Sequence, residues 1–448
     1  MHKRPPIPIV PVHPSPCRQR SQSIARCRIF CSKSAVGIVF PIHRCRIPQS
    51  KVDMPVKVSV KNIFKIFGME PHRGLELLKN GRSKEDIFEE TGQTVGVEDA
   101  SFDVEEGQIF VVMGLSGSGK STLVRMINGL IEPSAGQIII DGDDVASCSP
   151  ARLRDIRRNK VSMVFQHFAL FPHKTVAENV AFGLKIKGMP AEERRRRAME
   201  ALAQVGLESR ADSYPDELSG GMQQRVGLAR GLAAEPEILL MDEPFSALDP
   251  LIRRDMQEEL LELQRTLKKT IIFITHDLNE ALILGNQIAI MRNGRFVQTG
   301  TAEEIVANPA NDYVAAFTQD IDRSRVFTAD SVAGPADAVQ LSTDTAKNAI
   351  ERMEAAGSDA IYVLDGERIA GAVTYRDLTA LMRDNGGALA SALITDFPSA
   401  RRSTPLFELY SLAQSGLPIA VTNRKGRLDG VIAPQAVFAK LAGEAAAA

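Results

Sequence analysis

A glycine-rich segment, residues 114–122, carries the clearest chemistry in this sequence. It reads Gly114, Leu115, Ser116, Gly117, Ser118, Gly119, Lys120, Ser121 and Thr122, between a strand-like apolar run and a helical pattern that begins near Lys120. Backbone N–H groups of such a turn can wrap a phosphate chain, and the helix N-terminus adds partial positive charge. Lys120 can reach the β- and γ-phosphates, and the Ser121 hydroxyl can ligate Mg²⁺. The spacing therefore predicts a nucleoside triphosphate site rather than an incidental glycine turn.

Four further polar side chains end apolar, strand-like runs. Asp242 and Glu243 end one run, His276 a second and Gln166 a third. Open α/β sheets bind ligands at the carboxyl ends of their strands, so we expect these side chains to converge on the phosphates. We expect Asp242 and Gln166 to hold Mg²⁺ with Ser121. Glu243 would orient or deprotonate an attacking water, and His276 would contact the γ-phosphate rather than serve only a structural role.

A second anion site is predicted at residues 218–225, where Ser219 caps a helix that opens with two glycines. The phosphates bound at the glycine-rich loop of the same chain would not occupy this segment. A second anion site of this kind favours a dimer in which two chains clamp nucleotide between them.

Jointly, these motifs resemble the ATPase subunits of ABC transporters. The glycine-rich loop, Gln166, Leu218 to Gly221, Asp242-Glu243, Ser246 to Asp249 and His276 occur in that family's order, across residues 56–320. The resemblance implies ATP as substrate, Mg²⁺ as cofactor and a homodimer. The residues that would contact ATP on the other subunit are Ser219, Gly220, Gly221 and Gln223, with Asp249 at the dimer interface.

The resemblance also implies an aromatic side chain that stacks on adenine. Phe67 is the best match, although the family usually has tyrosine there, and Phe64 lies close by in the chain.

The alternation of strands and helices predicts an α/β fold in three parts. Residues 54–320 would form a P-loop NTPase of the ABC type, with a mixed sheet core, an antiparallel β subdomain and a helical subdomain. An insertion, residues 69–92, contains a short helix that starts at Ser83 and stops at Gly92. Residues 326–443 contain two similar units of strand, turn, strand and helix, an internal repeat.

The insertion and the C-terminal repeat indicate the subfamily. Together they resemble the ATPase of glycine betaine/proline importers, which commonly carries a tandem CBS pair; closely similar ATPases serve choline uptake. This resemblance implies transmembrane permease subunits and an extracytoplasmic substrate-binding protein as partners. It also implies a peripheral location on the cytoplasmic face of the inner membrane.

The first repeat carries Thr374 and Asp377, which match the CBS pattern that can hold a nucleotide ribose, whereas the second has Ala433 and Ala436. A nucleotide site, structural packing and salt sensing all remain open for the pair. The basic clusters at residues 401–402 and 424–427 are either ordinary solvated loops or contacts for anionic lipid.

Three rival functions share some of these features. An exporter ATPase would have every catalytic motif but neither the insertion nor the CBS-like tail. A soluble ABC ATPase of translation or DNA repair usually has two nucleotide domains or a long coiled coil, and this chain has one glycine-rich loop and neither feature. The C-terminal repeat could also be a nucleotide sensor that provides the main regulatory output.

Charge and hydropathy argue against two further roles. The formal net charge is −1, so we expect no nucleic-acid partner, and the basic run at residues 194–197 reads as a solvated helix face paired to Glu192 and Glu193. No stretch approaches the roughly 18 to 20 apolar residues of a membrane span. If the protein acts at a membrane, another chain must cross it.

Residues 1–53 differ from the remainder in composition. They hold ten Lys and Arg against one acid, eight prolines and four of the five cysteines. Disorder, a targeting segment and a translation start at Met54 all fit, and we favour the last. The cysteine spacings lack the paired pattern of a zinc site.

Overall fold

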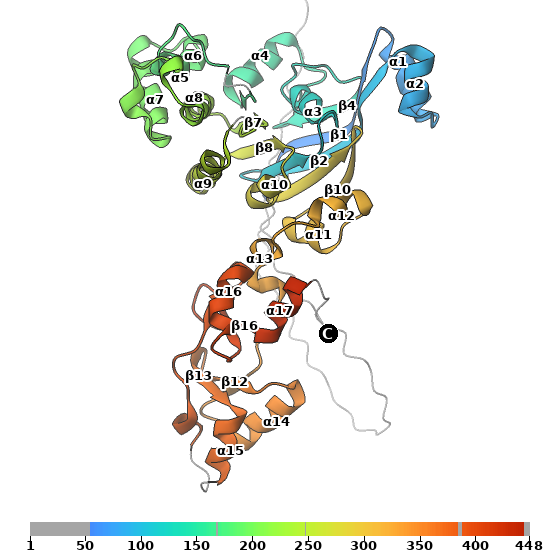
Figure 1. Ribbon diagram of the computed structural model, residues 1–448. Helices are drawn as coiled ribbons and strands as arrows, with labels where there is room; N and C mark the ends of the chain where they lie inside the picture. The colour runs from blue at the N-terminus through green and yellow to red at the C-terminus, as the bar shows by residue number, and fades with distance from the viewer. Residues whose placement is uncertain (1–53, 167–168, 247, 384–387, 443–448) are drawn as a thin grey trace, which may run out of the picture. The chain divides into compact units, whose positions relative to one another are not determined.

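The structure is a computed structural model that describes residues 54–166, 169–246, 248–383 and 388–442 (Figure 1). The predictions for residues 1–53 lie outside the described residues.

The nucleotide-binding part is built on a six-stranded sheet with the order β10-β9-β3-β8-β7-β6. Neighbouring strands from β9 to β6 run parallel, and β10 is antiparallel to β9, so the sheet is mixed, as predicted. Strands β3, β7 and β8 are buried along their whole length, which explains their continuous apolar sequences. The bounds are β3 Ile109–Met113, β6 Val161–Val164, β7 Ile238–Asp242, β8 Thr270–Thr275, β9 Gln287–Arg292 and β10 Arg295–Gly300.

An antiparallel sheet with the order β2-β1-β4-β5 forms the second layer, which confirms the predicted β subdomain. Its strands are β1 Val56–Phe67, β2 Thr94–Glu105, β4 Ala135–Ile140 and β5 Asp143–Asp144. Helix α3, Lys120–Ile127, packs its buried face into the apolar cluster shared by this sheet and the six-stranded sheet.

The insertion contains two helices, α1 Pro71–Lys79 and α2 Lys84–Thr91. The predicted helix is confirmed as α2, with a capping box between Ser83 and Asp86 and a left-handed Gly92 at its end. The prediction missed α1, which starts with proline at its first turn and packs Leu75 and Leu78 into a small core of its own.

The helical subdomain gathers α5 to α8 on one side of the molecule, drawn green in Figure 1. Its helices and the others of the nucleotide-binding part are α4 Pro150–Asn159, α5 Val176–Val180, α6 Phe182–Ile186, α7 Ala191–Gln204, α8 Gly220–Ala233, α9 Pro250–Leu267, α10 Leu278–Leu284, α11 Ala302–Ala307 and α12 Asp312–Thr318. Helices α5, α7, α8, α9 and α10 contribute to one apolar cluster with the six-stranded sheet.

The C-terminal part confirms the internal repeat. Each copy is a three-stranded sheet in which the first two strands are parallel and the last two antiparallel. The first copy contains β11 Ala338–Gln340, α14 Ala346–Ala356, β12 Ala360–Asp365, β13 Arg368–Thr374 and α15 Tyr375–Arg383. The second contains β14 Ser399–Arg401, α16 Leu406–Ala413, β15 Ile419–Thr422, β16 Leu428–Ile432 and α17 Pro434–Ala442, and α13 Arg323–Val326 precedes both.

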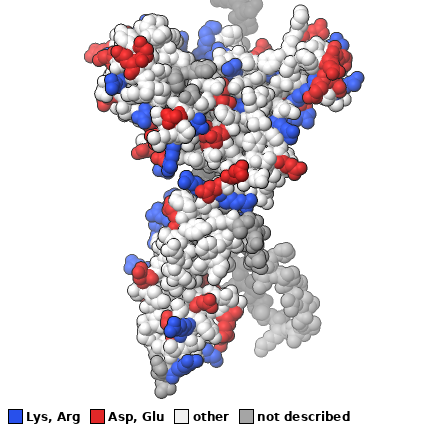
Figure 2. Space-filling view, viewed as in Figure 1, with Lys and Arg blue, Asp and Glu red and all other residues white. Residues whose placement is uncertain are grey.

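Charged side chains of both signs are interspersed on the face shown in Figure 2. In the basic run, Arg196 and Arg197 pair with Glu193, and Arg196 also with Glu200, which supports the interpretation as a solvated helix face. In the part of the chain that the structure describes, no helix is both long and apolar enough to cross a bilayer.

Candidate functional site

The glycine-rich loop joins β3 to α3, and its conformation depends on glycine. Gly119, the residue before α3, has a φ of 103°, and a Cβ there would lie 2.5 Å from the Gly96 carbonyl oxygen. Gly114 has a φ of 157°, and its Cβ would lie 2.2 Å from the Met291 carbonyl oxygen. Larger residues would therefore be excluded at both positions, and the loop can follow a phosphate chain closely.

Lys120 is buried at the first position of α3, with 4% of its surface exposed. Its Nζ donates to the carbonyl oxygens of Gly114, at 2.8 Å, and Leu115, at 3.0 Å. Burial lowers the pKa of Lys120, and the charge of Glu243, whose Oε1 is 3.7 Å from Nζ, opposes that shift. The ammonium is thus held inside the loop, where a phosphate chain would lie.

The tip of β7 brings a carboxylate to the start of α3. The Ser121 hydroxyl donates to Asp242 Oδ1 at 2.9 Å, and Arg125 Nη2 lies 3.8 Å from Asp242 Oδ2. Burial raises the pKa of Asp242, and the bond from Ser121 partly offsets the shift. A hydroxyl and a carboxylate oxygen together are ligands that Mg²⁺ accepts, so these two residues fit the predicted metal.

Glu243 and His276 meet beside this pair, at the ends of adjacent strands. His276 Nδ1 lies 3.0 Å from Glu243 Oε2, within hydrogen-bond distance. Glu243 has a φ of 46°, an uncommon left-handed conformation for glutamate, and its N–H donates to the Ile274 carbonyl oxygen of β8. The backbone is therefore held in a conformation that directs the carboxylate toward both Lys120 and His276.

Two predicted groups lie outside this cluster of contacts. Gln166 is an exposed residue that follows β6, at the carboxyl end of the parallel strands where Asp242 and His276 also lie. Ser219 caps α8 by accepting from the Met222 N–H, while the Gln223 amide donates to Pro215 and Leu218 carbonyls. A Cβ at Gly220 would meet open space, so the start of α8 presents bare backbone.

The predicted dimer residue Asp249 caps α9, where its carboxylate accepts from the backbone N–H groups of Leu251 and Ile252 at 3.1 Å. The Ile252 side chain packs against Gly221, where a Cβ would come within 2.5 Å of Ile252 Cγ2. The structure therefore places the start of α8 beside the start of α9.

The two aromatic candidates for adenine stacking have different surroundings. Phe64 packs partly into the small core of the insertion, whereas Phe67 is 40% exposed at the end of β1. The Phe67 ring lies against Gly96, which in turn touches Gly119 of the glycine-rich loop. This arrangement favours Phe67, because an exposed ring near the loop can receive a base.

Comparisons with known proteins agree with this geometry. The ABC transporter family model matches residues 97–246, and the CBS domain model matches residues 339–384. The glycine betaine/carnitine transport ATP-binding protein GbuA of Listeria monocytogenes is 51% identical over 389 residues, which cover 86% of this chain and 98% of that protein. The chain belongs to the ABC transporter family. This ABC protein is the ATP-binding, ATP-hydrolysing part of a transporter, and the predicted family and fold class are confirmed.

Two further matches also span nearly the whole length of the matched protein. The glycine betaine/proline betaine transport system ATP-binding protein ProV of Escherichia coli is 50% identical; the match covers 85% of this ABC protein and 96% of ProV. A solved structure, the dimeric post-hydrolysis state of the ATP-binding cassette MJ0796 with ADP and Pi, is 34% identical with a TM-score of 0.46; the match covers 55% of this chain and 98% of that one.

A set of polar residues next to this site was not predicted from the sequence. Arg253 lies four residues after Asp249, which caps α9, and Glu280 lies four residues after His276, which precedes the cap of α10. That spacing was the available signal, but an arginine or glutamate at one turn from a motif is common on exposed helix faces.

Proposed function

We propose that this ABC protein hydrolyses ATP to drive the import of glycine betaine and related compounds such as proline, proline betaine, carnitine or choline. The observation that carries the proposal is the match to GbuA, which spans nearly all of that relative and includes both the insertion and the CBS region. Permease subunits would form the path through the membrane, and an extracytoplasmic binding protein would deliver the substrate. The ATPase would sit on the cytoplasmic face of the inner membrane.

The geometry of the described residues supports a direct attack of water on the γ-phosphorus. Glu243 would accept a proton from water as the new P–O bond forms and the bond to the departing ADP breaks. Lys120 would stabilise charge on the β- and γ-phosphate oxygens, and His276 would orient Glu243 and contact the γ-phosphate. Mg²⁺, held by Ser121 and Asp242 with Gln166 as a further ligand, would neutralise phosphate charge.

The second half of each site would come from another copy of the chain. The exposed Ser219 and Gly220, and the N–H groups at the start of α8, support a second anion-binding surface. In a homodimer this surface, with Gln223 and Asp249, would close over ATP bound to the partner.

The CBS pair would regulate the ATPase by binding a nucleotide at its first copy. A cavity of about 490 Å³ lies between the copies and is lined by Asp359, Thr374 and Tyr375 from the first and Ala433 and Gln435 from the second. Thr374 also donates to Asp377 at 2.7 Å.

Anionic lipid is the less favoured ligand of the CBS pair. In the basic clusters that the sequence suggested for lipid, Arg402 already pairs with Asp330 and Asp429, and Arg427 pairs with Glu367. These ion pairs leave fewer cationic groups available to a membrane surface.

The substitution Glu243→Gln tests the proposal. It keeps the size and hydrogen-bonding capacity of the side chain but removes the proton acceptor, so we expect phosphate release to fall by roughly 100-fold or more while ATP binding and an ATP-dependent dimer persist. In cells that depend on this chain under osmotic stress, uptake of labelled glycine betaine should be restored by the wild type and not by the variant. Normal hydrolysis by the variant would remove Glu243 from its role. Equal uptake in cells with the wild-type protein and in cells with the variant would overturn the transport function.

A further inference from the structure

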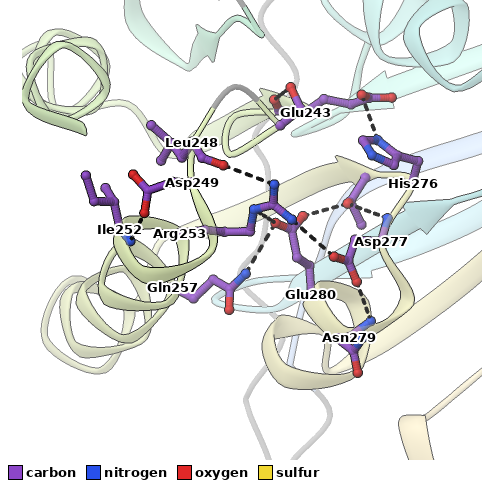
Figure 3. A network of polar contacts seen from close by, with 12 residues as sticks. Glu243, Leu248, Asp249, Ile252, Arg253, Gln257, His276, Asp277, Asn279 and Glu280 are labelled. Atoms are coloured by element: carbon purple, nitrogen blue, oxygen red, sulfur yellow. Dashed lines mark hydrogen bonds and ion pairs between the residues drawn. The ribbon is translucent and has the colours of Figure 1, made fainter. Parts of the chain in front are cut away.

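A partly buried polar network joins the two chain segments that carry Glu243 and His276 (Figure 3). Its centre is Arg253, in the first turn of α9, which faces Glu280 of α10. Neither residue belongs to the set that we expect to touch nucleotide or metal.

On one side, Arg253 holds the segment that follows Glu243. Its Nη2 donates to the Leu248 carbonyl oxygen at 3.1 Å. The same segment is closed internally by the Ser246 N–H, which donates to the Glu243 carbonyl oxygen, and by the Leu248 N–H, which donates to Phe245. The guanidinium is therefore bonded to Leu248, five residues after Glu243.

On the other side, Arg253 holds the residues that flank His276. Its Nη1 donates to Asp277 Oδ2 at 3.4 Å. The Thr275 hydroxyl accepts from the Asp277 N–H at 2.9 Å and donates to Glu280 Oε2 at 2.6 Å. Both chain neighbours of His276 are thus tied to the Arg253–Glu280 pair.

Three members of this arrangement, Gln257, Thr275 and Glu280, are buried. Glu280 is 4% exposed, and its carboxylate also accepts from Gln257 Nε2 at 3.2 Å. Arg253 Nε lies 3.8 Å from Glu280 Oε1, an electrostatic contact too long for a hydrogen bond. Burial raises the pKa of Glu280, while the bond from Thr275 opposes the shift. A buried carboxylate is costly without a nearby cation, so the pair favours one geometry.

We propose that Arg253, together with Glu280, is a positioning residue for ATP hydrolysis that holds the segments bearing Glu243 and His276 in register. The pair acts through those two residues and contacts neither phosphate nor metal. The inference rests on the proposed ATPase function. It predicts that loss of Arg253 slows the chemical step and leaves ATP affinity almost unchanged.

The test compares two neighbouring arginines of α9. Arg253→Met removes the guanidinium but keeps a long apolar side chain. Arg254→Met is the matched control, because Arg254 is exposed and pairs along the helix with Glu258. We expect kcat of Arg253→Met to fall about tenfold with the Kd for ATP unchanged, and Arg254→Met to match the wild type. Equal losses in kcat and ATP affinity, or full activity of Arg253→Met, would overturn the inference.

Two combined variants separate positioning from damage to the fold. On a His276→Ala background, Arg253→Met should cause a smaller loss than it does in the wild type, because the part of its effect that passes through His276 is already absent. The double variant Arg253→Met with Glu280→Gln removes the unpaired buried charge, and it should show the same loss of kcat with a recovered melting temperature. Two results would overturn the inference: additive losses of kcat when Arg253→Met is combined with His276→Ala, or a recovered kcat when Arg253→Met is combined with Glu280→Gln. A wild type without ATPase activity would instead overturn the proposed function.

Discussion

Glu243 shows how much of the site depends on single backbone positions. The residue directly follows a buried strand, and its left-handed φ turns the chain away from the sheet. Such conformations persist where the surroundings hold them, and here the N–H of Glu243 is bonded to β8. Because Lys120 lies on one side of the carboxylate and His276 on the other, a small change at this position would alter both contacts.

Phe67 offers a test of nucleotide binding at a single side chain. Phe67→Ala should raise the Kd for ATP by roughly 5- to 150-fold, the equivalent of about 1–3 kcal/mol of stacking, and change kcat little at saturating ATP. Equilibrium binding of a fluorescent ATP analogue measures the change. Phe67→Tyr keeps the ring and should bind like the wild type. An unchanged Kd in Phe67→Ala would exclude Phe67 as the stacking residue.

At the scale of elements, the insertion is a small packed unit tied to the glycine-rich loop. Lys84, at the start of α2, pairs with Glu98 of β2 at 3.1 Å and also donates to the Asn293 carbonyl oxygen. The next residue, Gly294, donates its N–H to the Ser118 carbonyl oxygen of the loop, and its own carbonyl accepts from the Glu98 N–H. The contacts form a continuous path from α2 to the phosphate site.

Glu98 is the charged centre of that path and gives a pH-dependent prediction. Burial raises its pKa, but bonds from Arg295 and Lys84 outweigh burial, so the pKa lies below the ordinary value of 4.5. A lowered pKa in the folded state means that the carboxylate adds stability above pH 4.5, which is lost as the pH falls. We therefore expect Glu98→Gln to lower the free energy of unfolding by about 1–3 kcal/mol at pH 7, with a smaller difference near pH 4.

Urea unfolding at the two pH values measures this effect. Glu89→Gln is a suitable control, since Glu89 is an exposed residue of α2. A gap between wild type and Glu98→Gln of the same size at both pH values would contradict the ion-pair explanation.

At the scale of the whole molecule, the residues assigned to ATP chemistry fall between Phe67 and His276, well before the predicted boundary at Asp320. The boundary itself is closely packed. Val306 of α11 is buried in one apolar cluster with Phe327 and Leu406, and Glu303 accepts from both the N–H and the hydroxyl of Thr328. The nucleotide-binding part therefore extends its contacts several residues past Asp320.

Truncation tests this division of labour. A chain that ends at Asp320 and one that ends at Ser331 should both hydrolyse ATP, but the shorter one should have a lower melting temperature because it uncovers Val306 and leaves Glu303 without Thr328. Phosphate release and thermal unfolding measure the two effects. Loss of hydrolysis in a folded chain ending at Ser331 would show that the CBS pair is required for the chemistry. Equal melting temperatures would contradict the packing argument.

The glycine-rich loop, the polar strand ends and the repeat could be predicted from the sequence, because each depends on local chemistry. A glycine-rich turn between strand and helix has few other uses, and continuous apolar runs ending in Asp242 or His276 specify buried parallel strands. Helix α1 was not predicted because it is short and its apolar face has no long periodic pattern; the face is stabilised by contacts with Ile66 of β1 and Val95 of β2. Sequence order alone contains little information about such contacts.

How these parts contact one another depends on tertiary packing. The structure adds that Phe67, already favoured by the sequence, is partly exposed near Gly96, whereas Phe64 packs in a core. It also shows Arg253 between the segments that carry Glu243 and His276, although Arg253 is 10 residues from Glu243 and 23 residues from His276 along the sequence. Side-chain networks between elements depend on the packing of α9 and α10 against the sheet, and that packing is a property of the whole fold.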